Sequence, residues 1–539
     1  MGDFTGGLVI ALLLFLLFIG ACLFLSMWAS PDLRVGDEFF RVSEDKRLST
    51  RMTGFAYSGD IANAAAVMYL VGVVAVAGGD GLFVALAAAL SPLLMRQWLA
   101  KRLAGAGGRS FGETVARHLP PGPGRRAAGF ALLAATVPLV TAQFQPLGDT
   151  AQMVGITDLE TRQLLIVLMG ALIVSCAAIG ATRGATVLQM AKMAGLVLIA
   201  PLLGLLVLIR FGGNFGSIFD AADRQRSGSA GSGSYLELGQ LFGNGPVGFV
   251  DLAAFCLCVL TGAAFMPYLI ARFTDAPKPA DARRVAGVGF AVIAPMCAAA
   301  ALIGFGAAAL VPHEKLVAQG QFGGNIIARL AIALDGGEDG LGKWLLFVLC
   351  ATFLMVLAAT SVLLLSAAAS IVRDLSSGGA VAKPEGRKSD GTTSVSAGRA
   401  RLIMVTIGGV SILLAALTPD VSPQFWLIVS YTVTTSSVLP LVIHGLRSDR
   451  PMSAAAMKRC VYGSTAAILI VTFFSPSVSG TPYALFPDLD WNYWPFHSSV
   501  LIGAPVGFLL ARPRRGDRPT RGAAVPQAQA ETPFPTRAG

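Results

Sequence analysis

The feature that most constrains the fold of this chain is a series of apolar runs, most of them about twenty residues long, enough to cross a bilayer core of roughly 30 Å as an α-helix. A soluble protein would instead disperse its apolar residues at periods of about 2 or 3.6 residues. Hydrophobic residues make up 54% of the 539 residues and charged residues only 13%. The sequence therefore predicts an all-α polytopic membrane protein.

We expect thirteen membrane-spanning helices, one for each run. The runs fall at residues 7–27, 55–77, 82–100, 127–154, 163–180, 186–210, 248–271, 287–312, 342–372, 402–418, 424–446, 460–475 and 498–512. The loops between them are too short for a nucleotide-binding or kinase domain, and no Walker-type phosphate loop occurs. These features argue against an ATP-driven pump and against a transporter-like module fused to a sensor kinase.

The basic residues are distributed unevenly between the two sides. Alternate loops, beginning with the loop after the first run, hold 32 of the 41 Lys and Arg residues, whereas the opposite loops hold 7. Under the positive-inside rule this places the N-terminus outside and the C-terminus inside a bacterial cytoplasmic membrane. The net charge of +10 then reflects membrane topology, and we expect no nucleic-acid partner.

The chain carries no signature of catalysis or of a cofactor. Its seven cysteines lie in or beside the apolar runs, without the spacing of a zinc site or a disulfide framework. No pair of nucleophile and base stands out either. We therefore expect no enzyme activity, no cofactor and no metal beyond a transported cation.

The span 55–77 contains the first candidate for a broken helix. Gly59 can interrupt the helix, and Ser58, Asp60 and Asn63 cluster within about two turns of it. Leaving an unpaired carboxylate such as Asp60 in the bilayer costs roughly 3 kcal/mol or more, which favours a functional role. The alternatives are a cap or a static ion pair near the inner end of the span.

The span 248–271 contains the second candidate. Gly262 and Pro267 bracket the sequence AAFM and would leave several backbone carbonyls without helical partners. This span comes five after the first candidate, so each opens a five-helix unit and the two units are inverted in the membrane. Matched interrupted helices are typical of symporter binding sites, while simple close packing by Gly and Pro is the alternative.

Three charged residues near these spans are given lesser roles. We expect Asp251 to be interfacial and Lys192 to extend toward the inner surface. Arg272, at the inner end of its span, is interpreted as an anchor or gate residue.

Six segments occur in a characteristic order along the chain. They are SGDIANAAA, the GGDGL turn at 78–82, RSFGETVARHL, ATRGATVLQMAK, FMPYLIARFTDAPKPADARR and ASIVRDL. On these segments the chain resembles the sodium:solute symporter family, specifically its branch of cation/acetate and monocarboxylate permeases. The resemblance is close from the second to the ninth span.

The resemblance implies a five-plus-five inverted-repeat core of the leucine-transporter type in residues 55–446. Residues 1–54 would form an extra N-terminal helix and an inner loop. Residues 447–512 would form two extra helices. Residues 513–539, rich in Pro, Ala, Gly and Arg, would form a disordered basic cytoplasmic tail.

In such proteins a sodium ion lies between the first broken helix and the span that corresponds here to 342–372. By position, the backbone carbonyls of Ser58 and Ile61 would bind the ion, since hard oxygen ligands suit a hard cation. Asp60 matches an acidic residue beside it.

The chain departs from this pattern at the hydroxyl ligands of the ion. Their usual positions hold Ala358 and Ala359, and the nearest hydroxyls belong to Thr360 and Ser361. Either these two serve as ligands in a shifted register, or the coupling ion is a proton with Asp60 as its carrier. Simple helix packing by Thr360 and Ser361 is the further alternative.

The resemblance also points to a small, mostly apolar solute site at the second helix break. Its residues would be Asn63, Ala64, Gln143, Ala264, Phe265, Met266 and Pro267. The expected function is symport of a short monocarboxylate (acetate, propionate or pyruvate) with Na⁺ or H⁺. The alternatives are a symporter for another small organic solute, such as an amino acid or polyol, and a transporter-like sensor or channel.

Overall fold

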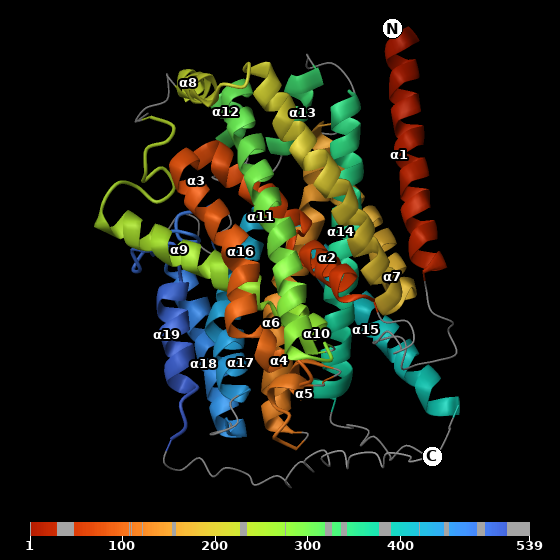
Figure 1. The fold of residues 1–539 in the computed structure, drawn as a ribbon, viewed down its shortest axis with the longest axis vertical. Coiled ribbons are helices and arrows are strands. Elements are labelled where there is room, and N and C mark those ends of the chain that lie inside the picture. Colours follow the sequence, from red (N-terminus) through yellow and green to blue (C-terminus); the bar gives the residue numbers. More distant parts are fainter. Residues whose placement is uncertain are drawn as a thin grey trace, which may run out of the picture.

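The protein is a bundle of helices in the computed structural model (Figure 1). The structure describes residues 2–29, 48–106, 108, 110–120, 122–153, 158–226, 234–274, 276–317, 326–335, 342–376, 390–419, 421–446, 452–481, 484 and 491–514. Within these ranges the regular structure is helical and contains no β-strand. The expected all-α fold is confirmed, while the predicted tail from residue 515 onward and the inner loop 30–47 lie outside the described residues.

The helices follow one another along the chain with short connections. They are α1 (Gly2–Trp28), α2 (Thr50–Ile61), α3 (Ala64–Trp98), α4 (Ala100–Leu103), α5 (Phe111–Val115), α6 (Pro123–Met153), α7 (Leu159–Arg210), α8 (Phe215–Arg226), α9 (Pro246–Phe265), α10 (Pro267–Thr274), α11 (Pro279–Leu310), α12 (His313–Val317), α13 (Ile326–Asp335), α14 (Lys343–Ser370), η3 (Ile371–Leu375), α15 (Asp390–Leu417), α16 (Pro423–Val433), η4 (Thr434–Val438), α17 (Leu439–Gly445), α18 (Ala454–Phe473) and α19 (Val500–Leu510).

Every predicted span overlaps one or more helices. Among the described residues, nine helices are long and apolar enough to cross a membrane. Two of them, α3 and α7, each contain parts of two predicted spans, divided by non-helical backbone at Gly78 and Ala181. At Gly78, where φ is +43°, an added Cβ would lie 1.9 Å from the carbonyl oxygen of Tyr235, so only glycine fits this bend.

The core has two five-span units that each begin with a broken helix. The first unit runs from α2 and α3 through α6 to α7, and the second from α9 and α10 through α11, α14 and α15 to α17. The short helices α2 and α10 contact each other in the middle of the bundle (Figure 1). The two interruptions therefore meet at one place, as an inverted repeat requires.

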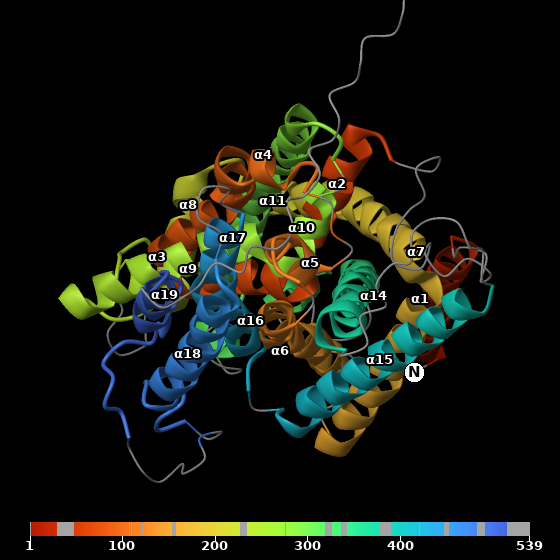
Figure 2. The ribbon, with the colours of Figure 1, turned by 90° about the horizontal axis from the view of Figure 1, so that it is seen from below.

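Three further helices flank this core. Helix α1 packs against α7 and α14, whereas α18 packs against α6 and α19 packs against α18 and η4. Seen from below, α1 lies at one edge of the bundle and α18 and α19 lie at the opposite edge (Figure 2). The broken helices are thus shielded from both of these edges.

The first helix break differs in position from the prediction, whereas the second falls inside the predicted segment between Gly262 and Pro267. Gly59 remains helical, and the first helix ends at Ile61. An added Cβ at Gly59 would lie 2.8 Å from the carbonyl oxygen of Gln189, so glycine lets α2 approach α7 closely. Gly262 also remains helical and lies against the Tyr431 side chain. A Cβ added at Gly262 would lie 2.5 Å from the Cβ of Tyr431. Both glycines allow close helix packing, and the chain breaks three to four residues later.

Candidate transport site

The first break places the carboxyl end of one helix against the amino end of the next. Helix α2 ends at Ile61 and α3 begins at Ala64, with Ala62 and Asn63 in non-helical conformations between them. Asn63 caps α3, because its Oδ1 accepts a hydrogen bond from the backbone N–H of Ala66 at 3.0 Å. The break therefore presents helix carbonyls on one side and helix amides on the other.

Asp60 forms an ion pair at the carboxyl end of α2. The Nε atom of Arg272 donates to Asp60 Oδ2 at 2.8 Å and its Nη2 donates to Oδ1 at 3.4 Å, while the Asp60 side chain is fully buried. Arg272 also donates through Nη1 to the Thr186 hydroxyl at 3.1 Å. Arg272, which was expected to be an anchor or gate residue, is thus the direct partner of Asp60. For Asp60, the structure shows the ion pair that the sequence analysis gave as an alternative.

The Asp60 backbone is held as well as its side chain. The Tyr268 hydroxyl, from α10, donates to the Asp60 carbonyl oxygen at 2.9 Å. Since Arg272 lies on the same short helix, α10 contributes two donors to one residue of α2. The two broken helices are therefore joined directly through polar contacts.

Lys192 also reaches this helix end. Its side chain is buried, with only 1% of the residue exposed, and its Nζ donates to the Gly59 carbonyl oxygen. The prediction that Lys192 extends to the inner surface is wrong. The released carbonyls of α2 provide an acceptor inside the bundle, which removes the need for the ammonium to reach water.

The predicted cation ligands have other partners. The carbonyl of Ser58 accepts from the Ala62 N–H at 3.0 Å, and that of Ile61 accepts from the Asn63 N–H at 2.8 Å. The Ser361 hydroxyl donates to the Leu357 carbonyl of its own helix at 2.7 Å.

Gln189 of α7 lies between the two helices expected to form the ion site. Its Nε2 donates to the Ala358 carbonyl of α14 at 3.2 Å, and it contacts Gly59 of α2. The Thr360 hydroxyl is buried and has no hydrogen-bond partner among the described residues, as is also true of Gln189 Oε1. The structure thus places a neutral amide between α2 and α14, beside the segment that holds the predicted hydroxyl ligands.

The structure brings Asn63, Ala64 and Gln143 together, as expected for the solute site. Gln143 Oε1 accepts from the backbone N–H of Ala64 at 3.0 Å and from that of Ala65 at 3.4 Å. Its Nε2 donates to Asn63 Oδ1 and to the Leu139 carbonyl, both at 3.1 Å. Gln143 therefore completes the hydrogen bonding of the first turn of α3.

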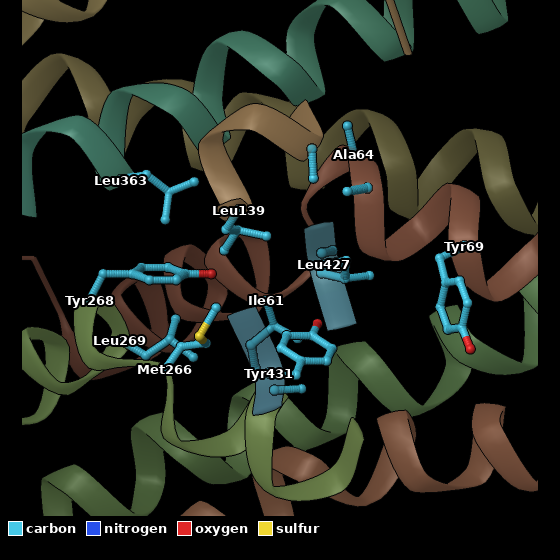
Figure 3. Close-up of a cluster of buried hydrophobic side chains, with 14 of the residues drawn as sticks. Ile61, Ala64, Tyr69, Leu139, Met266, Tyr268, Leu269, Leu363, Leu427 and Tyr431 are labelled. Atoms are coloured by element: carbon cyan, nitrogen blue, oxygen red, sulfur yellow. The ribbon is translucent and has the colours of Figure 1, made fainter. Parts of the chain in front are cut away.

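The second break falls at Met266, between α9 and α10. Ala264 and Phe265 end α9, and Pro267 begins α10, so these predicted residues flank the break. The Thr434 hydroxyl donates to the Met266 sulfur at 2.9 Å. Figure 3 shows Met266 in the same buried cluster as Ile61 of the first break.

Sequence reasoning missed the hydroxyl-bearing segment TTSSV of η4. It forms a π-helix, a distortion often found at functional sites, and its Thr435 hydroxyl lies 2.8 Å from the Thr261 hydroxyl of α9. The run of four hydroxyl residues inside an apolar span was the available signal.

Two cavities adjoin the broken helices. A cavity of about 230 Å³ is lined by Tyr268 and Arg272 and continues along Thr50 and Asp281, at the first turns of α2 and α11. A separate cavity of about 90 Å³ is almost wholly apolar, and Ile61 at the end of α2 is among its lining residues. The other lining residues of this second cavity include Ala62, Ala66, Ala263, Cys297, Thr352, Met355 and Tyr431.

Large side chains at the helix breaks line the two cavities, Tyr268 the larger one and Ile61 and Tyr431 the smaller one. Figure 3 shows Tyr268, Met266, Ile61 and Tyr431 gathered around the helix breaks, with Leu139 beside them. All five belong to the buried core. Of the predicted solute residues, Pro267 lines the larger cavity, while the lining of neither cavity includes Asn63, Ala64 or Gln143.

Asp251, expected at the membrane interface, lies near the start of α9 and is buried against other parts of the chain, with 1% exposed. Its carboxylate accepts from the backbone N–H groups of His497 at 2.6 Å and Ser498 at 2.9 Å. Asp251 therefore fixes the segment before α19 to the core, a structural role that its position in the sequence did not reveal.

Curated relatives span most of the chain. A Corynebacterium glutamicum protein named monocarboxylic acid transporter is 24% identical over 469 residues, covering 86% of this chain and 83% of that protein. A Bacillus subtilis protein named uncharacterized symporter YwcA is 25% identical over 505 residues, covering 93% of both chains. No protein-family profile matches the chain.

Solved structures share the fold at low sequence identity. A Na⁺-coupled sialic acid symporter in a substrate-bound, outward-open state has a TM-score of 0.63 at 14% identity, covering 93% of this chain and 96% of that chain. Mhp1, a nucleobase-cation-symport-1 family transporter in a closed conformation, has a TM-score of 0.50 at 14% identity, covering 86% of this chain and 93% of that one.

The chain has a multi-pass helical fold with the inverted-repeat core of the leucine-transporter type, and the paired helix breaks belong to this fold. The named relatives, a transporter and a symporter, indicate a secondary symporter of small organic solutes.

Proposed function

We propose that the chain takes up a short monocarboxylate, such as acetate, propionate or pyruvate, together with a cation, by alternating access. The observation that carries this proposal is the amino end of α3. There the N–H groups of Ala64 and Ala65 bond to the side-chain oxygen of Gln143, a neutral acceptor on a neighbouring helix.

This helix end has the properties of a carboxylate site. Free N–H groups and the helix dipole favour an anion at a helix amino terminus, and broken helices of transporters use this arrangement. A carboxylate oxygen can replace Gln143 Oε1 on Ala64 and Ala65. Gln143 would then be free to donate its Nε2 to the bound anion.

The small apolar cavity sets the size of the solute. Its lining includes Ile61, Ala62 and Ala66, which flank the amino end of α3, so an alkyl or acyl group would enter it. Its volume of about 90 Å³ is well below the roughly 300 Å³ of the smallest drug-sized pockets. This favours acids of two or three carbons over sugars and polyols.

An amino acid is less favoured than a simple acid. Its ammonium group would need an acceptor close to the carboxylate site, and Asp60 is the acidic side chain nearest along the chain. Both Asp60 oxygens already accept from Arg272. The relative named monocarboxylic acid transporter further supports an acid without an ammonium group.

We infer the orientation of this conformation in the membrane from the distribution of charge. The larger cavity lies at the first turns of α2 and α11, next to loops of the predicted cytoplasmic side. We therefore assign this conformation as facing the cytoplasm, with the N-terminus outside and the C-terminus inside. A rocking motion of the two repeats would close this cavity and open the site to the other side.

Uptake of radiolabelled pyruvate into proteoliposomes, with a panel of competitors, tests this proposal. Unlabelled acetate and propionate should inhibit uptake, whereas alanine and a polyol should not. Protein-free liposomes measure passive entry of the acid. Inhibition by alanine or the polyol without inhibition by acetate would contradict the monocarboxylate assignment.

A further inference from the structure

The ammonium group of Lys192 lies at the carboxyl end of α2, where the sequence predicted a cation site. We propose that the Lys192 ammonium takes the place of a bound metal cation there and carries the proton that is transported with the solute. This inference rests on the proposed function, since it names the coupling ion of the same transport site.

The position of Lys192 is that of a coordinated cation. Its Nζ donates to the carbonyl of Gly59, two residues before the last residue of α2. Carbonyls in the last turn of a helix lack intrahelical partners and carry a partial negative charge, which attracts a cation. The residue is 1% exposed, so the protein itself provides the solvation of this charge.

The surrounding side chains offer a second cation neutral oxygens only, such as the Thr360 hydroxyl and Gln189 Oε1. Gln189, one turn before Lys192 on α7, donates its amide to the Ala358 carbonyl and fills the space between Gly59 and α14. The stretch Leu357–Ser361 of α14 contains no titratable or anionic side chain. A sodium ion would therefore compete with an ammonium already tethered at the site.

The charged form of Lys192 depends on the Gly59 carbonyl for its stabilisation. Asp60 of α2 is the nearby carboxylate, but Arg272 of α10 already neutralises it. The hydroxyls of Tyr57 of α2 and Tyr268 of α10 also interact with Asp60. The cluster thus carries one uncompensated positive charge, which is costly to keep in the bundle once the carbonyl contact is lost.

A conformational change would break the contact between Lys192 and the Gly59 carbonyl and would give the proton a route to water. Thr186, which lies about two turns before Lys192 on α7, lines the larger cavity. When α2 moves away from Lys192, an N–H bond of the ammonium breaks, the electron pair stays on nitrogen, and water in the cavity takes the proton. The neutral amine is protonated again from the opposite side in the next cycle.

Three variants in proteoliposomes test this assignment, with labelled pyruvate, sodium-free buffer and an imposed pH gradient. Wild-type protein should accumulate pyruvate. Lys192→Met should accumulate none above protein-free liposomes, but should still exchange labelled for unlabelled pyruvate in counterflow. Lys343→Met, which removes an exposed lysine at the start of α14, is the matched control and should behave as wild type.

The variant Lys192→Arg keeps the positive charge at this position but removes the ability to release a proton. A guanidinium stays protonated in proteins, so this variant should also retain counterflow and lose accumulation. Full accumulation by either Lys192 variant would overturn the proposal, and so would loss of counterflow in both, which would give Lys192 a purely structural role. Failure of wild-type protein to exchange pyruvate at all would instead contradict the proposed function.

Discussion

The two helix ends that meet at the first break hold opposite kinds of partner. At the carboxyl end of α2, Lys192 and Tyr268 donate to backbone carbonyls. At the amino end of α3, Gln143 and Asn63 accept from backbone amides. Because the two ends of a helix carry partial charges of opposite sign, one break supplies a site for a cation and a site for an anion.

The partners also differ in charge, and this difference suggests which site is occupied permanently. A charged residue of the chain fills the cation end, while neutral amides fill the anion end. A neutral acceptor gives way to a carboxylate more easily than a tethered ammonium gives way to a sodium ion. The following variants test this contrast, beginning with the largest expected effect.

Arg272→Met should be the most damaging change at the carbonyl end. It leaves the buried Asp60 carboxylate without its ion-pair partner, at a cost of about 3–5 kcal/mol in folding free energy. Thermal unfolding of the purified protein in detergent measures the loss. The double variant Asp60→Asn with Arg272→Met should recover much of it, and a stable single variant would show that the pair does not hold Asp60.

Gln143→Leu should weaken solute transport at the amide end. The variant keeps a similar shape but loses the amide that would bind the carboxylate, which should cost about 1–3 kcal/mol and raise the half-saturating pyruvate concentration about 5- to 150-fold. Counterflow kinetics measure this change. Gln163→Leu, which removes an amide donor to the Ala416 carbonyl far along the chain, is the matched control.

If both glutamine variants had the same half-saturating concentration as wild type, the carboxylate would not bind at the amino end of α3. An equal increase in both would show a general loss of stability instead.

Tyr268→Phe should have a moderate effect at the carbonyl end. It removes one hydrogen bond to the Asp60 carbonyl and should lower the free energy of unfolding by about 1 kcal/mol. Denaturation midpoints compare it with Tyr462→Phe, a change at a half-exposed residue that should be neutral. An unchanged midpoint for Tyr268→Phe would mean that α10 does not brace α2 through this hydroxyl.

Thr360→Val should have the smallest effect. The Thr360 hydroxyl is buried without a partner, so replacing it by a methyl group of the same shape should leave stability unchanged or slightly raised. Pyruvate uptake should also be unchanged. Loss of uptake in this variant would identify Thr360 as an ion ligand and favour a sodium site between α2 and α14.

The sequence predicted the positions of the helices well and the position of the first helix break less well. Apolar runs depend on local composition, which is why each predicted span overlaps one or more helices. The first break was placed at Gly59, yet Asn63 ends the interruption as the cap of α3. Capping by asparagine is a local signal that could have located the break.

The charged contacts could not be predicted in the same way. Lys192 and Arg272 lie on helices far from Asp60 in the sequence, and their roles depend on which helix faces turn toward α2. Composition reveals that a charge lies within a span, but packing decides its partner. For the same reason, the amide of Gln189 between α2 and α14 was not foreseen.

The most direct test of this account is the ion dependence of pyruvate uptake by the wild-type protein. Proteoliposomes would receive either an inward proton gradient without sodium or an inward sodium gradient at equal pH. The account predicts accumulation with the proton gradient alone, and no response to sodium, because Lys192 occupies the carbonyl end of α2. Accumulation driven by sodium at equal pH would contradict it and place a metal ion at that helix end.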